Sequence, residues 1–153
     1  MQDTFDVAVV MPSMLRPQLK DALRSIFAQD LPGRIQVLIG IDTFDGDYSL
    51  VESVCDERPT NCAVQIFYPG YSTSRRHGGL GLASDGGVLR LVLSHIANSR
   101  YVAYLDDDNF WRSDHLRLLC DCMKQADWAF LLATTRHLFL PARLEFCTAL
   151  TAI

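Results

Sequence analysis

The chain has 153 residues, a length typical of one domain, with 49% apolar and 21% charged residues. These proportions are those of ordinary globular proteins, and they exclude disordered, collagen-like and low-complexity classes. The net charge of −4 offers no broad basic field, so we expect no nucleic acid partner. We expect a single domain over residues 1–153.

Strand-like and helix-like patterns alternate along the chain. Continuous apolar runs predict strands at residues 7–11, 35–41, 63–68, 101–105 and 128–134. Apolar positions at helical spacing predict helices at residues 16–29, 48–56 and 88–97, and a further helix that begins after an N-cap at Ser113. In the helix at 88–97, we expect Val88, Leu91, Val92 and Ile96 to face inward. The alternation predicts an α/β fold, with a mostly parallel sheet and flanking helices.

No segment favours secretion or membrane insertion. The first residues lack the basic and apolar regions of a signal peptide, and the longest apolar stretch, residues 128–135, is far shorter than the roughly 20 residues of a spanning helix. Five cysteines without a C-x-x-C pair favour free or buried thiols over a zinc site. We expect a cytoplasmic location, with peripheral contact to a membrane left open.

Aspartates follow two of the predicted strands. Asp42 ends one strand, and Asp106, Asp107 and Asp108 follow another, so a parallel sheet would bring them to the edge where ligands bind. Three adjacent carboxylates repel one another, and Mg²⁺ or Mn²⁺ would relieve that repulsion. Residues i and i+2 of an extended segment face one side, so Asp106 and Asp108 are the candidate metal ligands. A solvated acidic turn, and a turn-capping role for Asp42, are the alternatives.

Three arginines are candidates for binding a polyphosphate: Arg75, Arg76 and Arg90. The first two lie in a long glycine-rich loop at residues 71–87, where we favour ordinary surface positions for them. The length of that loop indicates function or mobility. His77, beside the glycines, is a candidate for gating a ligand, whereas we interpret His115 as a surface helix residue in preference to a metal ligand.

Three segments resemble GT-A-type glycosyltransferases, in particular the large inverting family 2. Residues 7–13 with Arg16 are similar to the family's opening V-S-V-V-I-P-T-x-N-R. Residues 19–32 resemble the helix L-x-x-A-L-x-S-[IV]-x-x-Q-x-x-P. Residues 101–109 read Y-V-A-Y-L-D-D-D-N and resemble Y-[IV]-A-F-L-D-x-D-D, which contains the D-x-D signature. The resemblance covers about residues 7–127.

This resemblance implies a Rossmann-like GT-A nucleotide-binding domain. It implies nucleotide-binding roles for Pro12, Ser13, Arg16, Asp42, Arg90, Asp106 and Asp107, with Asp42 on the base, which is usually uracil. Asp108 would ligate Mn²⁺ or Mg²⁺ on the diphosphate, and Asp106 would contact the ribose or the same metal. The implied reaction transfers a sugar from a nucleotide-diphosphate donor, foremost a UDP-sugar, to the hydroxyl of an unidentified acceptor, with inversion.

The sequence departs from the family at several places. Of the paired aspartates in the family's V-D-D-G-S-x-D, only Asp42 remains. The A-R-N-x-G helix keeps Arg90 but has Leu91 and Leu93 in place of its asparagine and glycine. Family members carry the catalytic base and the acceptor site many tens of residues beyond the D-x-D, whereas 45 residues follow Asp108 here. We therefore expect the C-terminal acceptor part to be missing, and we assign no base.

Two other functions stay open. One is a non-catalytic nucleotide-sugar-binding module or fragment, and the other is a metal-dependent nucleotidyltransferase, although residues 12–16 lack the glycine-rich loop of such enzymes. If the chain is truncated, exposed apolar side chains would favour self-association. The candidates are Leu138, Phe139, Leu140 and Phe146.

Overall fold

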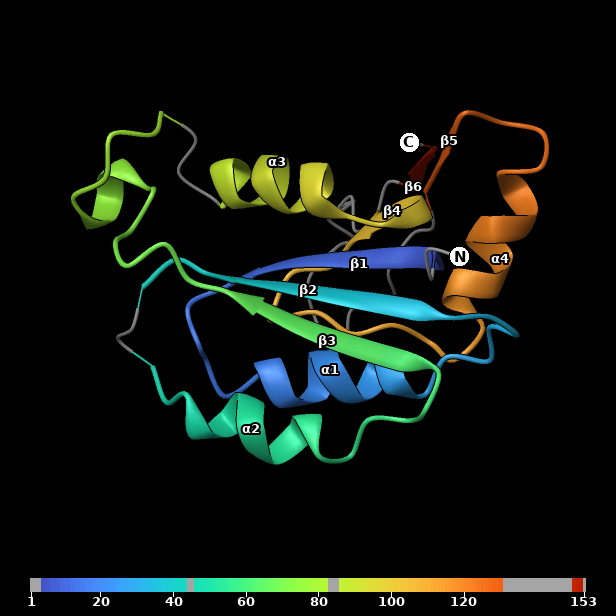
Figure 1. Ribbon diagram of the computed structural model, residues 1–153, viewed down its shortest axis with the longest axis horizontal. Coiled ribbons are helices and arrows are strands. Elements are labelled where there is room, and N and C mark those ends of the chain that lie inside the picture. The colour runs from blue at the N-terminus through green and yellow to red at the C-terminus, as the bar shows by residue number, and fades with distance from the viewer. Residues whose placement is uncertain (1–3, 44–45, 83–85, 131–149, 153) are drawn as a thin grey trace, which may run out of the picture.

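One six-stranded sheet organises the molecule (Figure 1). The computed structural model describes residues 4–43, 46–82, 86–130 and 150–152. The strands are β1 (Phe5–Ser13), β2 (Ile35–Ile41), β3 (Cys62–Phe67), β4 (Ser99–Tyr104), β5 (Trp128–Ala129) and β6 (Leu150–Ala152), in the order β3-β2-β1-β4-β6-β5. The helices are α1 (Leu19–Phe27), α2 (Ser49–Cys55), α3 (Gly87–Ile96) and α4 (His115–Cys122), and η1 (Arg75–His77) is a short 3-10 helix.

Among the described strands, only β6 runs against the direction of the others. β1 lies between β2 and β4, and β2 pairs with β3, all in parallel, whereas β6 runs antiparallel to both β4 and β5. The predicted α/β fold with a mostly parallel sheet and flanking helices is confirmed. The predicted fifth strand is confirmed only as β5, since residues 131–134 lie outside the described part, and β6 was not predicted.

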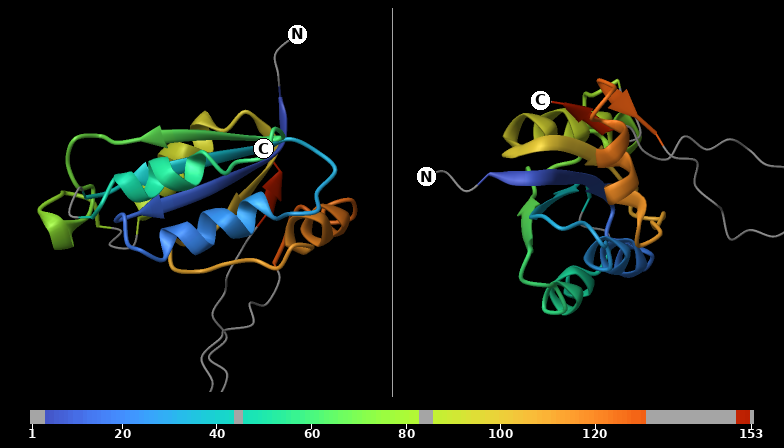
Figure 2. Two further views of the ribbon diagram at one scale, coloured as in Figure 1. Left: turned by 90° about the horizontal axis from the view of Figure 1, so that it is seen from below. Right: turned by 90° about the vertical axis from the view of Figure 1, so that its right-hand side faces the viewer.

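Helices cover both faces of the sheet, with α1 and α2 on one side and α3 on the other (Figure 2). This explains why the sequences of β1 and β2 are continuous apolar runs, since a strand covered on both faces is buried on both. Val7, Val9 and Met11 of β1 face the α1 side, and Ala8 and Val10 face the α3 side. β1 is therefore the centre of both halves of the core.

The inward face of α3 differs from the prediction. Leu89 and Leu93 are buried, whereas Leu91 and Ile96 are 61% and 53% exposed. Val88 and Val92 are partly buried. Apolar residues surround most of this helix, so their spacing alone does not select a face. Gly40 of β2 favours the observed face, because a Cβ there would lie 2.9 Å from the Leu93 side chain and 3.3 Å from Cβ of Leu89.

The side chain of Gln29 joins the end of α1 to the start of α4. Its Oε1 accepts the backbone N–H of Leu116 at 2.8 Å, and its Nε2 donates to the carbonyl of Arg112 at 2.6 Å. Gln29 thus takes the part of a capping residue. The predicted N-cap, Ser113, is wrong: α4 begins after Asp114, whose side chain makes no capping hydrogen bond. Ser25 Oγ adds a bond from the Trp111 N–H at 3.1 Å.

The described cysteines are free thiols. Burial raises the pKa of both Cys62 and Cys120 to about 11, which makes them poor nucleophiles at neutral pH. Cys147 lies outside the described residues, as do the four apolar residues considered for self-association. None of the helices in the described ranges is long and apolar enough to cross a bilayer.

His115 is a core residue, and its interpretation as a surface histidine is wrong. It is 7% exposed, and its ring stacks on Trp111 with the ring centroids 4.7 Å apart. Among the described residues, its Nε2 has no hydrogen-bond partner. Burial lowers the pKa of His115 to about 4, and the charge of Asp114 opposes that shift only partly.

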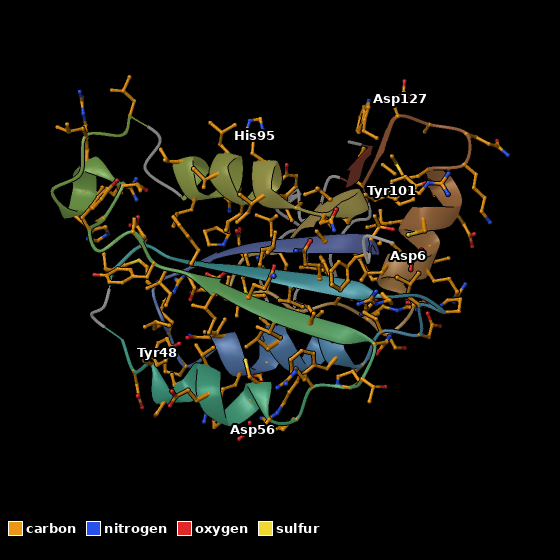
Figure 3. All side chains as sticks on the ribbon, in the orientation of Figure 1. Asp6, Tyr48, Asp56, His95, Tyr101 and Asp127 are labelled. Atoms are coloured by element: carbon orange, nitrogen blue, oxygen red, sulfur yellow. The ribbon has the colours of Figure 1, made fainter. Side chains whose placement is uncertain are left out.

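The buried His115 predicts a loss of stability in mild acid. In the unfolded chain His115 takes up a proton near pH 6.5, whereas in the folded chain it stays neutral until about pH 4. The free energy of unfolding therefore falls as the pH drops from 6.5 to 4, by about 3 kcal/mol from this residue. Urea unfolding at a series of pH values measures it. His115→Phe is expected to flatten the profile, and His95→Gln, on the exposed outer side of α3 (Figure 3), is expected to leave it unchanged.

Candidate functional site

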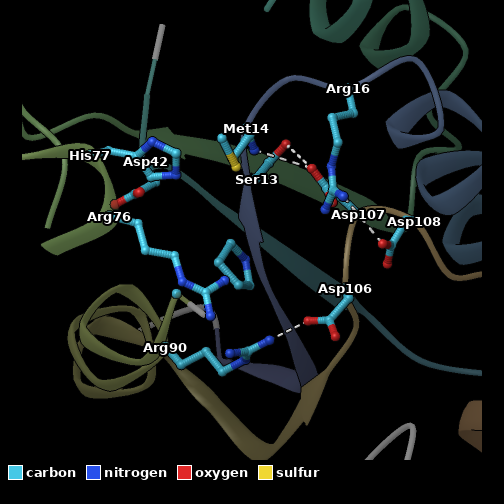
Figure 4. Close-up of a pocket in the computed structure, with 12 residues that line it drawn as sticks. Ser13, Met14, Arg16, Asp42, Arg76, His77, Arg90, Asp106, Asp107 and Asp108 are labelled. Atoms are coloured by element: carbon cyan, nitrogen blue, oxygen red, sulfur yellow. Dashed lines mark hydrogen bonds and ion pairs between the residues drawn. The ribbon is translucent and has the colours of Figure 1, made fainter. Parts of the chain in front are cut away.

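A pocket of about 350 Å³ lies at the carboxyl ends of β1, β2 and β4 (Figure 4). Its lining residues are Pro12, Ser13, Met14, Arg16, Asp42, Arg76, His77, Gly86, Arg90, Asp106, Asp107 and Asp108. Every residue predicted to bind nucleotide or metal is in this set. The parallel pairing of the strands explains the convergence, because it brings their carboxyl ends to one edge.

Asp107 connects the end of β4 to the end of β1. It is 1% exposed, and its Oδ2 accepts the Ser13 hydroxyl at 2.7 Å and the Met14 N–H at 3.1 Å. Its Oδ1 accepts Nη2 of Arg16 at 2.5 Å. Both oxygens of this carboxylate are therefore occupied by the protein. The structure gives Asp107 a role in shaping the pocket, and its predicted contact with nucleotide stays a prediction.

The turn after β1 is held in an unusual conformation. Leu15 has a φ of 57°, in the left-handed region that a non-glycine residue rarely adopts. The Ser13 hydroxyl accepts the Leu15 N–H at 2.9 Å, and the Leu15 side chain is buried. This turn places Arg16 beside the aspartates. Backbone strain of this kind persists only where the surroundings enforce it, and here Asp107 and Ser13 do so.

Arg16 and Arg90 pair with the aspartates from opposite sides of the pocket. Nη1 of Arg16 lies 3.3 Å from Oδ2 of Asp108, and Arg90 donates to Oδ1 of Asp106. Burial alone would lower the pKa of Arg16, but its hydrogen bond to Asp107 and the charges of the neighbouring aspartates raise that pKa above its ordinary value. These ion pairs hold both arginines at the pocket wall.

Asp42 is buried and holds the loop that follows β3. Its Oδ2 accepts the Ser72 hydroxyl at 2.8 Å, and its Oδ1 accepts both the N–H and the hydroxyl of Thr73, at 2.9 and 3.0 Å. A carboxylate has about four acceptor positions, so three of them are taken. The turn-capping interpretation of Asp42 foresaw a local partner, whereas the partners are 30 residues away in the chain.

Met14 and Gly86 line the pocket although the sequence did not assign them to it. Arg76, a candidate for binding a polyphosphate, and His77, a candidate for gating a ligand, also line it. Arg75 and Arg76 are both exposed, as expected, but Arg76 reaches the pocket and Arg75 does not. The length of the glycine-rich loop indicated a function for this segment. Nothing in its sequence, however, shows which of the two arginines points towards the pocket.

The carboxylates of Asp106 and Asp108 fit a metal site that is completed by a bound ligand better than one that the protein forms alone. Their side chains are 48% and 45% exposed, and each has one oxygen in an ion pair with an arginine. Across the described ranges, no three histidine, cysteine or acidic side chains come together as a metal cluster. Mg²⁺ and Mn²⁺ are commonly bound by one or two carboxylates together with phosphate oxygens and water. Asp106 and Asp108 can provide the two carboxylates.

The sequence matches no known family model, and no curated protein matches it significantly. Solved structures do match its fold. Residues 1–349 of S. aureus TarS in complex with UDP superpose with a TM-score of 0.68 at 17% identity, over 90% of this chain and 38% of that one. The same protein has been solved with UDP-GlcNAc. The chain thus spans well under half of the TarS structure.

Two further solved structures match the fold of this chain. The mannosyltransferase PcManGT from Pyrobaculum calidifontis, solved with GDP-Man and Mn²⁺, matches with a TM-score of 0.62 at 20% identity, over 82% of this chain and 34% of that one. A 4-diphosphocytidyl-2C-methyl-D-erythritol synthase from Anaerococcus prevotii matches with a TM-score of 0.57 at 11% identity, over 96% and 70%. At these identities the likeness shows the fold alone: a Rossmann-like α/β fold shared with glycosyltransferases.

The two neighbouring aspartates Asp107 and Asp108 are expected to differ sharply in their effect on stability. Asp107→Asn replaces a buried carboxylate that accepts hydrogen bonds from an arginine and two further donors. We expect this substitution to lower the free energy of unfolding by about 3 kcal/mol. Asp108→Asn removes an exposed ion pair, and we expect a change below about 1 kcal/mol. Urea unfolding at pH 7 measures both. Equal losses in the two variants would contradict the role of Asp107 as the connection between β1 and β4.

Proposed function

We propose that the pocket binds the nucleoside diphosphate of a nucleotide-sugar donor, and that the chain belongs to a glycosyltransferase. One observation carries this proposal: arginines and exposed carboxylates meet at the carboxyl ends of parallel strands, in a fold whose solved neighbours hold UDP, UDP-GlcNAc or GDP-Man. A UDP-sugar is the first candidate for the donor. Family 2 membership and a cytoplasmic location are part of the same proposal.

Asp106 and Asp108 are proposed to hold Mn²⁺ or Mg²⁺ against the diphosphate. Bound there, the cation supplies stabilisation of the negative charge that grows on the diphosphate as the bond to the sugar breaks. The chain's own residues hold the donor in place: Arg16 and Arg90 line the wall beside these carboxylates, and Pro12 and Ser13 form the floor at the end of β1. The acceptor hydroxyl would attack from the face opposite the diphosphate, with inversion.

The four aspartates of the described pocket supply no free carboxylate to act as a base on the acceptor hydroxyl. Asp42 and Asp107 are buried and occupied by hydrogen bonds, and Asp106 and Asp108 are paired with arginines. This arrangement favours, as the second candidate, a module that binds a nucleotide sugar without transferring it. Incubating donor with a panel of hydroxyl acceptors and following release of the nucleoside diphosphate separates the two.

A nucleotidyltransferase is the third candidate, and the match to the diphosphocytidyl-methylerythritol synthase is the observation that favours it. Such an enzyme would consume a nucleoside triphosphate and release pyrophosphate. The turn after β1 argues against it, because residues 12–16 contain no glycine that lets a triphosphate approach the backbone. Pyrophosphate release from CTP or UTP with a panel of sugar phosphates and phosphorylated alcohols tests this candidate directly.

We expect UDP to bind in a cation-dependent manner. Isothermal titration of UDP with and without Mn²⁺ measures it, and Asp108→Asn should weaken binding by about tenfold or more, because a ligand to the cation is lost. Asp121→Asn, an exposed carboxylate on α4 outside the pocket, is the matched control and should bind as the wild type does. Absence of binding to UDP, GDP and their sugars would refute a donor site. Equal binding with and without the cation would refute the metal role alone.

A further inference from the structure

The loop between β3 and α3 has a defined shape over residues 72–81. It folds back on itself through hydrogen bonds from the Gly79 N–H to the Ser74 carbonyl at 2.8 Å and from the Gly81 N–H to the Thr73 carbonyl at 3.0 Å. A Cβ at either glycine would lie 2.4 Å from a backbone oxygen, so only glycine permits this fold. The loop is therefore a preformed platform at the pocket's edge.

Asp42 fastens this platform to the end of β2. The three hydrogen bonds that its carboxylate accepts all come from Ser72 and Thr73, at the start of the loop. Ser72 Oγ also accepts the Ser74 N–H at 3.1 Å, and Ser74 Oγ in turn accepts the Arg76 N–H at 3.2 Å. A chain of hydrogen bonds thus runs from the buried carboxylate of Asp42 to the backbone of Arg76.

Arg76 brings a third guanidinium to the pocket. Figure 4 shows its side chain extending from the loop towards Arg90 of α3, although the two come from different elements. The diphosphate of the proposed donor is an anion, and arginine forms short, charge-assisted hydrogen bonds with phosphate oxygens.

We propose that Arg76 binds the diphosphate, and that Asp42 is a positioning residue that holds the loop carrying Arg76 and does not select the base. This inference rests on the proposed function, since it names further residues of the same donor site. It assigns Asp42 a different role from the one that the family resemblance implies. A group that reads the base affects nucleotides only, whereas a group that places Arg76 affects every ligand that contains a diphosphate.

Inorganic pyrophosphate, which has no base, distinguishes the two roles. Titrations in one Mg²⁺ buffer compare pyrophosphate with UDP or GDP, whichever the wild type binds more tightly. Arg76→Ala should weaken both ligands by roughly 10- to 100-fold, the loss expected for a charged hydrogen bond. Arg75→Ala removes the adjacent arginine, which does not line the pocket, and should leave both affinities unchanged.

Asp42→Ala should weaken nucleotide and pyrophosphate by the same factor. Because Asp42 acts through Arg76, the double variant Asp42→Ala/Arg76→Ala should bind no more weakly than the weaker single variant. Ser72→Ala combined with Thr73→Val keeps the carboxylate and removes two of its donors, so it should reproduce the pattern even if Asp42→Ala does not fold. Circular dichroism and thermal unfolding establish which variants are folded.

The outcomes that overturn the inference are distinct from failure of the proposed function. If Asp42→Ala weakens the nucleotide and leaves pyrophosphate unchanged, Asp42 reads the base and the positioning role is wrong. If Arg76→Ala binds as Arg75→Ala does, Arg76 does not contact the diphosphate. Both results leave a donor site in place. If the wild type binds neither nucleotide nor pyrophosphate, the proposed function and this inference fall together.

Discussion

The buried carboxylate of Asp107 is the interaction on which the pocket depends. A carboxylate with 1% exposure is costly unless its charge is paired and its oxygens accept hydrogen bonds, and Ser13, Met14 and Arg16 meet both needs. These partners lie at the end of β1 and in the turn that follows it. Asp107 thereby fixes the conformation of that turn, and its two neighbours, Asp106 and Asp108, are left pointing into the pocket.

Charge is distributed in the pocket so that each exposed aspartate faces an arginine. Arg16 and Arg90 offset the repulsion between Asp106 and Asp108 in the ligand-free protein, a role that a cation could take over when a donor is bound. The arginines would then be available to phosphate oxygens. Under the proposed function, the same groups would stabilise the pocket both without and with a donor, and their partners would change between the two states.

Sequence patterns predicted the elements well and their contacts less well. Residues 35–41 were predicted as a strand, and β2 has those bounds, because a strand buried on both faces is apolar throughout. The inward face of α3 was missed because it depends on the sheet against which the helix packs, where Gly40 leaves room for Leu89 and Leu93. The burial of His115 depends likewise on Trp111 and on the docking of α4.

In the candidate site, too, the sequence predicted positions along the chain better than contacts between elements. The aspartates and Arg90 could be found from their positions after strands and from the family resemblance. Two residues of the resembling helix, Ser25 and Gln29, now have a physical reason to be there, since they hold the segment that follows Asp108. The direction of Arg76 could not be found, because it depends on hydrogen bonds between Asp42 and a loop 30 residues further on.

The separation of Ser13 and Asp107 has a consequence for how the protein folds. Their hydrogen bond joins positions 94 residues apart, and β1 reaches its partner β4 only after β2, β3 and α3 have been synthesised. Contacts of such long range form slowly, because closing a large loop costs chain entropy before any bond forms. The pocket therefore completes late, and a ligand that binds it stabilises only chains whose central sheet has already closed.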